Sequence, residues 1–195
     1  MARPLIELAS TSRYRCQLLE RLRLPFEVHA PQVDETPLPS ETPRETALRL
    51  ARAKAENVAT QFPDAIIIGS DQTLDLNGQA LGKPLTHEAS LAQLQALQGR
   101  TVVFFTALAV AGPSRVQIDC VPTTVTFRKL PSAQLDAYLH SDQPYDCAGA
   151  AKVESLGIAL VETVVSDDPT ALIGLPLIRL TSMLASAGVD VLAGR

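Results

Sequence analysis

The first candidate for chemistry is a hydroxyl-rich turn near the start of the sequence. It reads Ser-Thr-Ser-Arg-Tyr-Arg over residues 10–15 and precedes an apolar-periodic segment that predicts a helix. The amides of a helix N-terminus, the hydroxyls of Ser10 and Ser12 and the guanidinium of Arg15 are suited to holding phosphate. The turn lacks the glycines and the G-K-[ST] ending of a P-loop. Taken alone, it also fits an ordinary helix cap beside a surface arginine.

Carboxylates in two separate segments are candidates for holding a metal ion. Asp34 and Glu35 lie in a proline-rich stretch, and Asp71 follows the apolar run at 66–68. Carboxylates from separate loops are hard oxygen ligands that Mg²⁺ or Mn²⁺ accepts together with substrate phosphates. Acidic loop residues are usually only solvated, which is the alternative for Asp34. A carboxylate at the end of a buried strand is costly unless it is paired, bound to metal or used, so Asp71 is the stronger candidate.

Two lysines supply candidate positive charge. Lys54 lies among small residues in a predicted helix, and Lys83 lies in the rigid segment Gly82-Lys83-Pro84. Each alone fits a solvated surface lysine. If both faced one cleft, they would neutralise a polyphosphate and its transition state.

Histidine and cysteine chemistry is not indicated. His29, His87 and His140 fall on a predicted strand, a helix start and a helix end, away from the segments above, and are interpreted as structural or surface residues. The cysteines are three, an odd number without a C-x-x-C pair. This argues against a disulfide framework or a zinc knuckle, favours core thiols and fits a reducing cytosol.

The N-terminal part of the sequence predicts elements that would position these groups. We expect strands over 5–8 and 26–30, a helix over 13–23, and an irregular proline-rich loop over 31–42. The next helix has a clear start signal, with Thr42 as N-cap, Pro43 at the first helical position and Glu45 completing a capping box. It is expected to end near Gln61.

The rest of the sequence predicts an α/β domain with a mixed, partly antiparallel sheet. A buried strand over 66–68 is expected to stop at Gly69, and Asn77-Gly78 indicates a hairpin between 73–76 and 79–81. A helix over 86–98 and long strands over 101–111 and 116–127 follow. A helix after Ser132, a strand near 158–164 and a helix from Pro176 to Gly188 complete the prediction. The polar residues above would then lie at strand ends, where open α/β sheets bind ligands.

Length and composition limit the remaining possibilities. The 195 residues predict one domain over 1–195, with two lobes around a cleft as a variant. Hydrophobic residues make up 46% and charged residues 19%, which argues against disorder. The net charge of −4 argues against binding a nucleic acid polymer, and no apolar run reaches the roughly 20 residues of a membrane span. Without a signal peptide pattern, a cytoplasmic location is expected.

A series of short motifs along the chain resembles the Maf family of nucleoside triphosphate pyrophosphatases. The motifs occur in the family's order and with compatible spacing: L-A-S-T-S-R-Y-R at 8–15, V-D-E-T at 33–36, A-R-A-K-A at 51–55, I-I-G-S-D-Q at 67–72, G-K-P at 82–84, C-A-G at 147–149 and G-L-P-L at 174–177. The resemblance implies an elongated, twisted, mixed sheet flanked by helices around a nucleotide-binding cleft, as in Maf and ITPase-like proteins, and usually a homodimer.

The resemblance also implies an activity and roles for particular residues. The family hydrolyses a nucleoside triphosphate between its α- and β-phosphates, giving monophosphate and pyrophosphate, with a divalent metal cation such as Mg²⁺ or Mn²⁺. Asp71 matches the proton acceptor that activates water, and Glu35, together with Asp71, matches the carboxylates that hold the metal. The phosphate contacts match Ser10, Ser12, Arg15, Lys54 and Lys83.

Two further positions, Gln72 and Glu154, are similar to the YceF-type branch of the family, whose implied substrate is 7-methyl-GTP. Tyr14 is the third position that bears on this substrate. Methylation at N7 makes guanine cationic, which favours an aromatic face and a nearby carboxylate. Tyr14 would stack on the base and Glu154 would accept from it, although that branch more often has tryptophan at the Tyr14 position. The alternatives are a pyrophosphatase for dTTP, UTP or nucleotides in general, and a nucleotide-binding regulator of cell division without turnover.

Overall fold

A long antiparallel hairpin forms the centre of the fold. We describe residues 4–193 from a computed structural model. β5 (Thr101–Ala111) and β6 (Val116–Phe127) pair along their whole length, from Thr101 opposite Thr126 to Ala111 opposite Val116. Both segments are rich in β-branched and aromatic residues, which favour strands.

The hairpin belongs to a mixed, seven-stranded sheet. Six strands follow the order β2-β1-β3-β5-β6-β7, and the seventh, β4, pairs with β3 outside this order. The short β1 (Ile6–Ala9) pairs in parallel with β2 (Glu27–His29) and with β3 (Ile66–Leu76). The remaining pairings are antiparallel, including those of β4 (Gln79–Leu81) with β3 and of β7 (Val161–Val165) with β6. The predicted α/β class with a mixed, partly antiparallel sheet is therefore confirmed.

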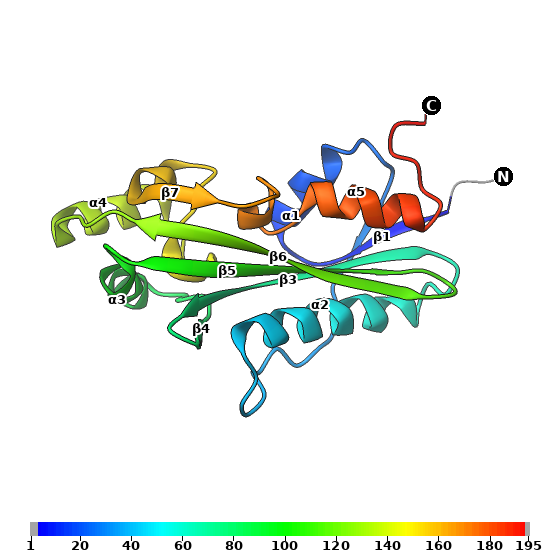
Figure 1. The fold of residues 1–195 in the computed structure, drawn as a ribbon, viewed down its shortest axis with the longest axis horizontal. Coiled ribbons are helices and arrows are strands. Elements are labelled where there is room, and N and C mark those ends of the chain that lie inside the picture. Colours follow the sequence, from blue (N-terminus) through cyan, green and yellow to red (C-terminus); the bar gives the residue numbers. More distant parts are fainter. Residues whose placement is uncertain (1–3, 194–195) are drawn as a thin grey trace.

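Helices cover both faces of this elongated, twisted sheet, as Figure 1 shows. α1 (Arg13–Glu20) and α5 (Leu177–Ser186) lie on one face, and α2 (Pro43–Ala59) lies along the other. α3 (His87–Leu97) and α4 (Ser132–Asp142) lie at the far end of the long strands. Short 3₁₀ turns occupy 148–150, 156–160 and 171–173.

The apolar core has three parts that follow this layering. One lies between the sheet and the helices α1 and α5, and a second, at the far end, joins α3 and α4 to β5, β6 and β7. The third is alanine-rich and lies between α2 and the strands β3 and β5. Small side chains in this third part allow the helix to approach the sheet closely.

The close approach of α2 is concentrated at Gly69 of β3. A Cβ atom at this position would lie 2.3 Å from the backbone oxygen of Ala51 and 2.9 Å from the Cβ of Ala55. Only glycine therefore fits against this helix, because such distances are far below van der Waals contact. The helix begins as predicted, since Thr42 and Glu45 form a reciprocal capping box.

Some predicted boundaries were wrong. β3 does not stop at Gly69 but continues to Leu76, because β5 pairs with it without interruption from Ile67 to Asp75. α1 ends at Glu20, short of residue 23. The predicted strand near 158–164 is a 3₁₀ turn up to Leu160, followed by β7.

Among residues 4–193, none of the helices combines the length and apolar character needed to cross a membrane.

Candidate active site

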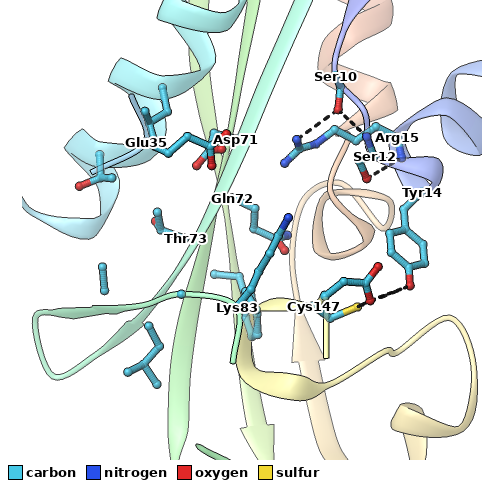
Figure 2. A pocket seen from close by; sticks show the side chains of 18 of the residues that line it. Ser10, Ser12, Tyr14, Arg15, Glu35, Asp71, Gln72, Thr73, Lys83 and Cys147 are labelled. Carbon is cyan, nitrogen blue, oxygen red and sulfur yellow. Dashed lines mark hydrogen bonds between the residues drawn. The ribbon is translucent and has the colours of Figure 1, made fainter. Parts of the chain in front are cut away.

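A large polar cavity lies over the middle of the sheet. Its volume is about 620 Å³. Each residue to which the family motifs gave a role lines it: Ser10, Ser12, Tyr14, Arg15, Glu35, Lys54, Asp71, Gln72, Lys83 and Glu154. These residues come from α1, α2, β3 and several loops, so segments far apart in the sequence meet around one space (Figure 2).

The hydroxyl-rich turn before α1 is held in a fixed conformation. Ser12 is the N-cap of α1, and its Oγ accepts a hydrogen bond from the Arg15 amide at 3.5 Å. The Ser10 Oγ accepts from the Ser12 amide at 3.1 Å and from an Arg15 guanidinium nitrogen at 3.5 Å. Hydroxyls, a helix N-terminus and a guanidinium therefore converge at one wall of the cavity, an arrangement suited to an anion.

Arg15 is anchored from behind by a turn distant in the sequence. Its Nε donates to the carbonyl of Gly174 at 2.9 Å, and the Ser70 hydroxyl donates to the same carbonyl at 3.0 Å. Gly174 adopts a φ of +119°, which L side chains rarely adopt. Burial lowers the pKa of Arg15, although Asp71 and Glu35 favour its charged form. The guanidinium is thus positioned by the G-L-P-L and G-S-D-Q motifs together.

The electrostatic centre of the cavity is a cluster of Glu35, Lys54 and Asp71. The Lys54 Nζ lies 2.7 Å from the Glu35 Oε1 and 2.7 Å from the Asp71 Oδ1. Lys54 is 5% and Asp71 7% exposed, whereas Glu35 extends from the proline-rich loop into solvent. The other Asp71 oxygen, Oδ2, accepts no hydrogen bond from the described part of the chain. One carboxylate oxygen is therefore held while its partner remains able to accept a proton.

The sequence predicted that Asp71 lies at a strand end, and this prediction was wrong. Asp71 lies in the middle of β3, opposite Ala107 of β5. The reason is the continuous ladder with β5, in which residues 70–72 are paired, so this polar run is part of the strand. The Asp71 side chain therefore lines the cavity from the face of the sheet and not from a loop at its edge.

The charges around Glu35 keep it ionised. Partial burial opposes its ionisation, but the hydrogen bond and charge of Lys54 outweigh this effect, aided by Lys83 and Arg15, and lower the pKa of Glu35 below its ordinary 4.5. Lys83 lies in the exposed loop after β4 and points into the cavity (Figure 2). It forms no hydrogen bond or ion pair with any residue between 4 and 193 and is available to a ligand.

The donor set at this position also fits a hard divalent cation. Glu35 and Asp71 direct carboxylate oxygens toward the same cationic group, the Lys54 ammonium. Mg²⁺ and similar ions bind through one or two carboxylates with phosphates completing the shell. Asp34 is not part of this set, since its carboxylate accepts from the Thr36 amide in its own exposed loop.

Tyr14 forms the opposite end of the cavity. Its hydroxyl accepts from Arg13 at 2.7 Å and lies 3.4 Å from Asp146, while the Arg13 guanidinium also lies over the ring, 4.7 Å from its centroid. The Cys147 thiol contacts the same hydroxyl at 3.7 Å, and burial raises the pKa of that thiol to about 12. A thiol with so high a pKa is protonated at neutral pH, which disfavours nucleophilic chemistry at Cys147.

Two further acidic side chains contribute to the cavity. Glu154, which was predicted, and Asp146, which was not, both line the cavity. Burial raises the pKa of Glu154 above its ordinary 4.5. Asp146 had a signal in the sequence, since it directly precedes the C-A-G motif, but only the fold shows that this motif faces Tyr14.

Gln72 is committed to the framework of the site through its amide nitrogen. This nitrogen donates to the Thr106 hydroxyl at 2.9 Å and to the carbonyls of Ala171 and Leu172 at 3.1 Å. Gln72 therefore holds the 171–173 turn against the sheet. A direct contact of Gln72 with substrate stays a prediction.

The fold and the cavity define an α/β protein with a polar cleft suited to an anionic ligand, and comparison with known families narrows the class. The family model described as Maf-like protein matches residues 5–187. The chain belongs to the Maf family, as the resemblance of its motifs had implied.

Full-length relatives carry a more specific name. A protein of Polaromonas sp. named 7-methyl-GTP pyrophosphatase is 57% identical over 196 residues, covering 100% of this chain and 89% of the relative. A protein of the same name from Thiobacillus denitrificans is 60% identical over 191 residues, covering 97% and 95%. The solved structure of a HAM1 protein from Coxiella burnetii covers 94% of this chain and 100% of its own, with a TM-score of 0.54 and 18% identity, and supports the fold alone.

Proposed function

We propose that this protein hydrolyses a modified nucleoside triphosphate, preferentially 7-methyl-GTP, to the monophosphate and pyrophosphate. The observation that carries the proposal is the buried Lys54–Asp71 pair, opposite a phosphate-type turn, in a cavity of about 620 Å³. The names of relatives at 57% and 60% identity support the same substrate.

The phosphate chain is assigned to the cationic half of the cavity. Ser10, Ser12 and Arg15 bind phosphate oxygens from one wall, and Lys83 binds them from the opposite loop. Lys83 makes no hydrogen bond or ion pair with the described residues, and its approach to the triphosphate adds charge neutralisation as negative charge moves to the leaving group.

Asp71 is assigned as the general base. Its Oδ2 accepts a proton from the attacking water, the water oxygen bonds to the α-phosphorus, and the bond from that phosphorus to the bridging oxygen breaks, so pyrophosphate leaves. Lys54 holds Oδ1 and orients the carboxylate during this step. Little covalent chemistry is required beyond position, charge and a base.

Glu35 and Asp71 are assigned as the residues that hold a divalent cation, Mg²⁺ or Mn²⁺. When bound, this cation neutralises charge on the phosphate oxygens. Lys54 contacts both carboxylates and keeps the two side chains close together.

The nucleobase of the substrate is assigned to the end of the cavity near Tyr14. N7-methylguanine is cationic, so it gains from the aromatic face of Tyr14 and from the carboxylates of Glu154 and Asp146. Arg13 already covers one face of the ring at 4.7 Å, which leaves the other face for the base. Glu154 accepts hydrogen bonds from the guanine edge.

Measurement of pyrophosphate release over a nucleotide panel with Mg²⁺ or Mn²⁺ tests the proposal. The expected result is faster turnover of 7-methyl-GTP than of GTP, dTTP or UTP. Faster cleavage of dTTP or UTP would favour the alternative of a general or pyrimidine nucleotide pyrophosphatase. Tight binding without turnover at any metal concentration would favour the alternative of a cell-division regulator.

A homodimer in the cytoplasm is the proposed setting. Edge strand β7 exposes Val164 and Val165, and such an apolar edge is commonly covered by a partner. The cysteines Cys16, Cys120 and Cys147 are all free, which fits a reducing compartment. Light scattering coupled to size exclusion measures the oligomeric state.

A further inference from the structure

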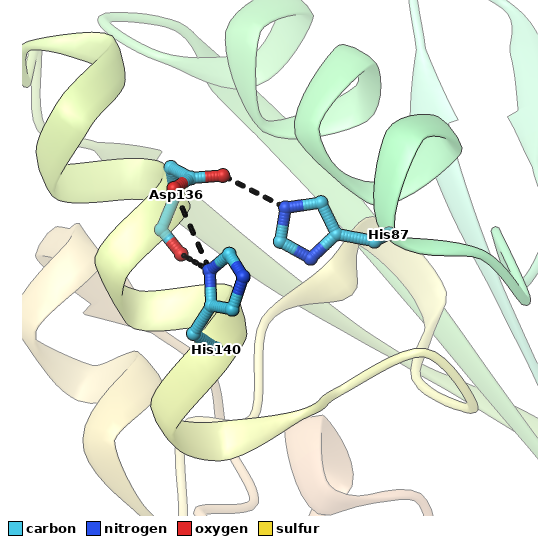
Figure 3. A group of neighbouring side chains, drawn as sticks. All are labelled: His87, Asp136 and His140. Atoms are coloured by element: carbon cyan, nitrogen blue, oxygen red, sulfur yellow. Dashed lines mark hydrogen bonds and ion pairs between the residues drawn. The ribbon is translucent and has the colours of Figure 1, made fainter.

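A second group of titratable side chains lies outside the cavity, where α3 meets α4. His87 is the first residue of α3, and Asp136 and His140 lie one turn apart on α4. Their ligand atoms all lie within 4.8 Å of one another (Figure 3). The proposed reaction uses none of these residues.

The atoms of this cluster are arranged around the Asp136 carboxylate. The His87 Nε2 lies 2.8 Å from Asp136 Oδ1, and the His140 Nδ1 lies 3.5 Å from Asp136 Oδ2. Around a tetrahedral Zn²⁺ with bonds of about 2.0 Å, neighbouring ligand atoms lie about 3.3 Å apart. The three groups therefore need only small shifts to bind one ion, with the His140 Nδ1 leaving the Asp136 carbonyl that it contacts at 3.0 Å.

The second nitrogen of His87 orients this ring for a metal. His87 Nδ1 lies 3.1 Å from the Tyr145 hydroxyl, and that hydroxyl donates to the Leu139 carbonyl. In the metal-free protein Nε2 donates its proton to the Asp136 carboxylate, and when a metal ion replaces this proton the hydroxyl oxygen can accept from Nδ1 while Nε2 presents its lone pair to the ion. Metal-bound histidines characteristically donate their other N–H to such a partner.

The cluster is accessible and connected to the cavity wall. The side chains of His140, Asp136 and His87 are 69%, 46% and 25% exposed, so an ion can enter and a water can complete its shell. The Leu85 amide donates to the Tyr145 carbonyl at 3.0 Å. An ion here would join α4 to the first residue of α3, which directly follows the loop that carries Lys83.

We propose that His87, Asp136 and His140 form a binding site for a divalent transition metal of the Zn²⁺ class. Two imidazoles and one carboxylate favour Zn²⁺ and its neighbours, whereas the all-carboxylate pair in the cavity favours Mg²⁺ or Mn²⁺. The two sites therefore select different ions, and this proposal does not depend on the proposed reaction.

Calorimetric titration of the metal-stripped full chain with Zn²⁺, in excess Mg²⁺, tests the site. We expect one Zn²⁺ per chain and a rise in Tm on binding. His87→Ala and His140→Ala should lose both effects. Tyr145→Phe should weaken binding about tenfold, because it removes only the outer partner of His87.

Matched controls separate this site from the other candidates. Asp71→Asn removes a cavity carboxylate and should leave Zn²⁺ binding unchanged. His29→Ala disrupts the other cluster of histidine and carboxylates, Glu7-Glu27-His29, and should also leave it unchanged. Absence of Zn²⁺ uptake, uptake that survives His140→Ala, or uptake lost in Asp71→Asn would each overturn the proposal.

Discussion

The Nζ atom of Lys54 and the Oδ1 atom of Asp71 lie 2.7 Å apart, and both side chains are almost completely buried. The contact joins the middle of α2 to the middle of β3. It exists because Gly69, two residues before Asp71, lets the helix approach the strand to distances that any Cβ would prevent. The Lys54–Asp71 ion pair of the site therefore depends on the close packing of α2 against β3.

Replacing the proposed base should remove turnover and preserve the fold. Asp71→Asn keeps the shape of the side chain and loses the proton acceptor. We expect kcat to fall by about 10²- to 10⁴-fold, the usual contribution of a general base. Pyrophosphate release measures kcat, with thermal unfolding as the control for folding. Unchanged turnover would contradict the assignment of Asp71.

Removing one partner of the buried pair should destabilise the protein. Lys54→Met leaves the Asp71 carboxylate buried without its ion-pair partner, and we expect a loss of about 3 kcal/mol in the free energy of unfolding. The double variant Lys54→Met, Asp71→Leu should regain much of this loss, because no unpaired charge remains. Urea unfolding of the wild type, the single variants Lys54→Met and Asp71→Leu and the double variant completes a double-mutant cycle, and purely additive losses would argue against coupling.

Adding one methyl group at Gly69 should displace α2. A Cβ at this position meets backbone of Ala51 and the side chain of Ala55, so the helix must move away. We expect Gly69→Ala to cost about 1–3 kcal/mol, as overpacking does, and to lower kcat/KM by shifting Lys54 from Asp71. Gly82→Ala is the control, since nothing lies within 4 Å of its Cβ position. Equal effects of both substitutions would refute the packing argument.

Glu154 should determine the preference for the methylated base. Glu154→Gln replaces a charged acceptor by a neutral one, so we expect the ratio of kcat/KM for 7-methyl-GTP over GTP to fall about tenfold. Tyr14→Ala should also reduce the ratio by removing the aromatic face. Tyr14→Phe keeps the ring and is the matched control. If the ratio is unchanged in both Glu154→Gln and Tyr14→Ala, other residues recognise the methylated base.

The KM for 7-methyl-GTP should depend on pH through the same residue. Burial raises the pKa of Glu154 above 4.5, and only its ionised form attracts the cationic base. Affinity is therefore present above the raised pKa and is lost as pH falls through it, starting at a higher pH than for an exposed glutamate. The dependence should be weaker in Glu154→Gln, which controls for titration of the substrate. Identical profiles for both proteins would exclude this role.

Local sequence signals and motif residues determined much of the architecture and the membership of the site. The capping box of Thr42 and Glu45, the hairpin turn at Asn77-Gly78 and the long strands after Gly99 depend on neighbours close in sequence, and all occur as predicted. The motif residues proposed for the site likewise all line one cavity.

Only the tertiary structure decided how these residues interact, because their partners are distant in the sequence. Asp71 lies within β3 and not at its end, since pairing with β5 extends the strand beyond the apolar run. The contacts of Lys54 with Glu35 and of Arg15 with Gly174 join separate elements. The meeting of His87 with His140 likewise depends on the packing of α3 against α4, which no periodicity in either helix specifies.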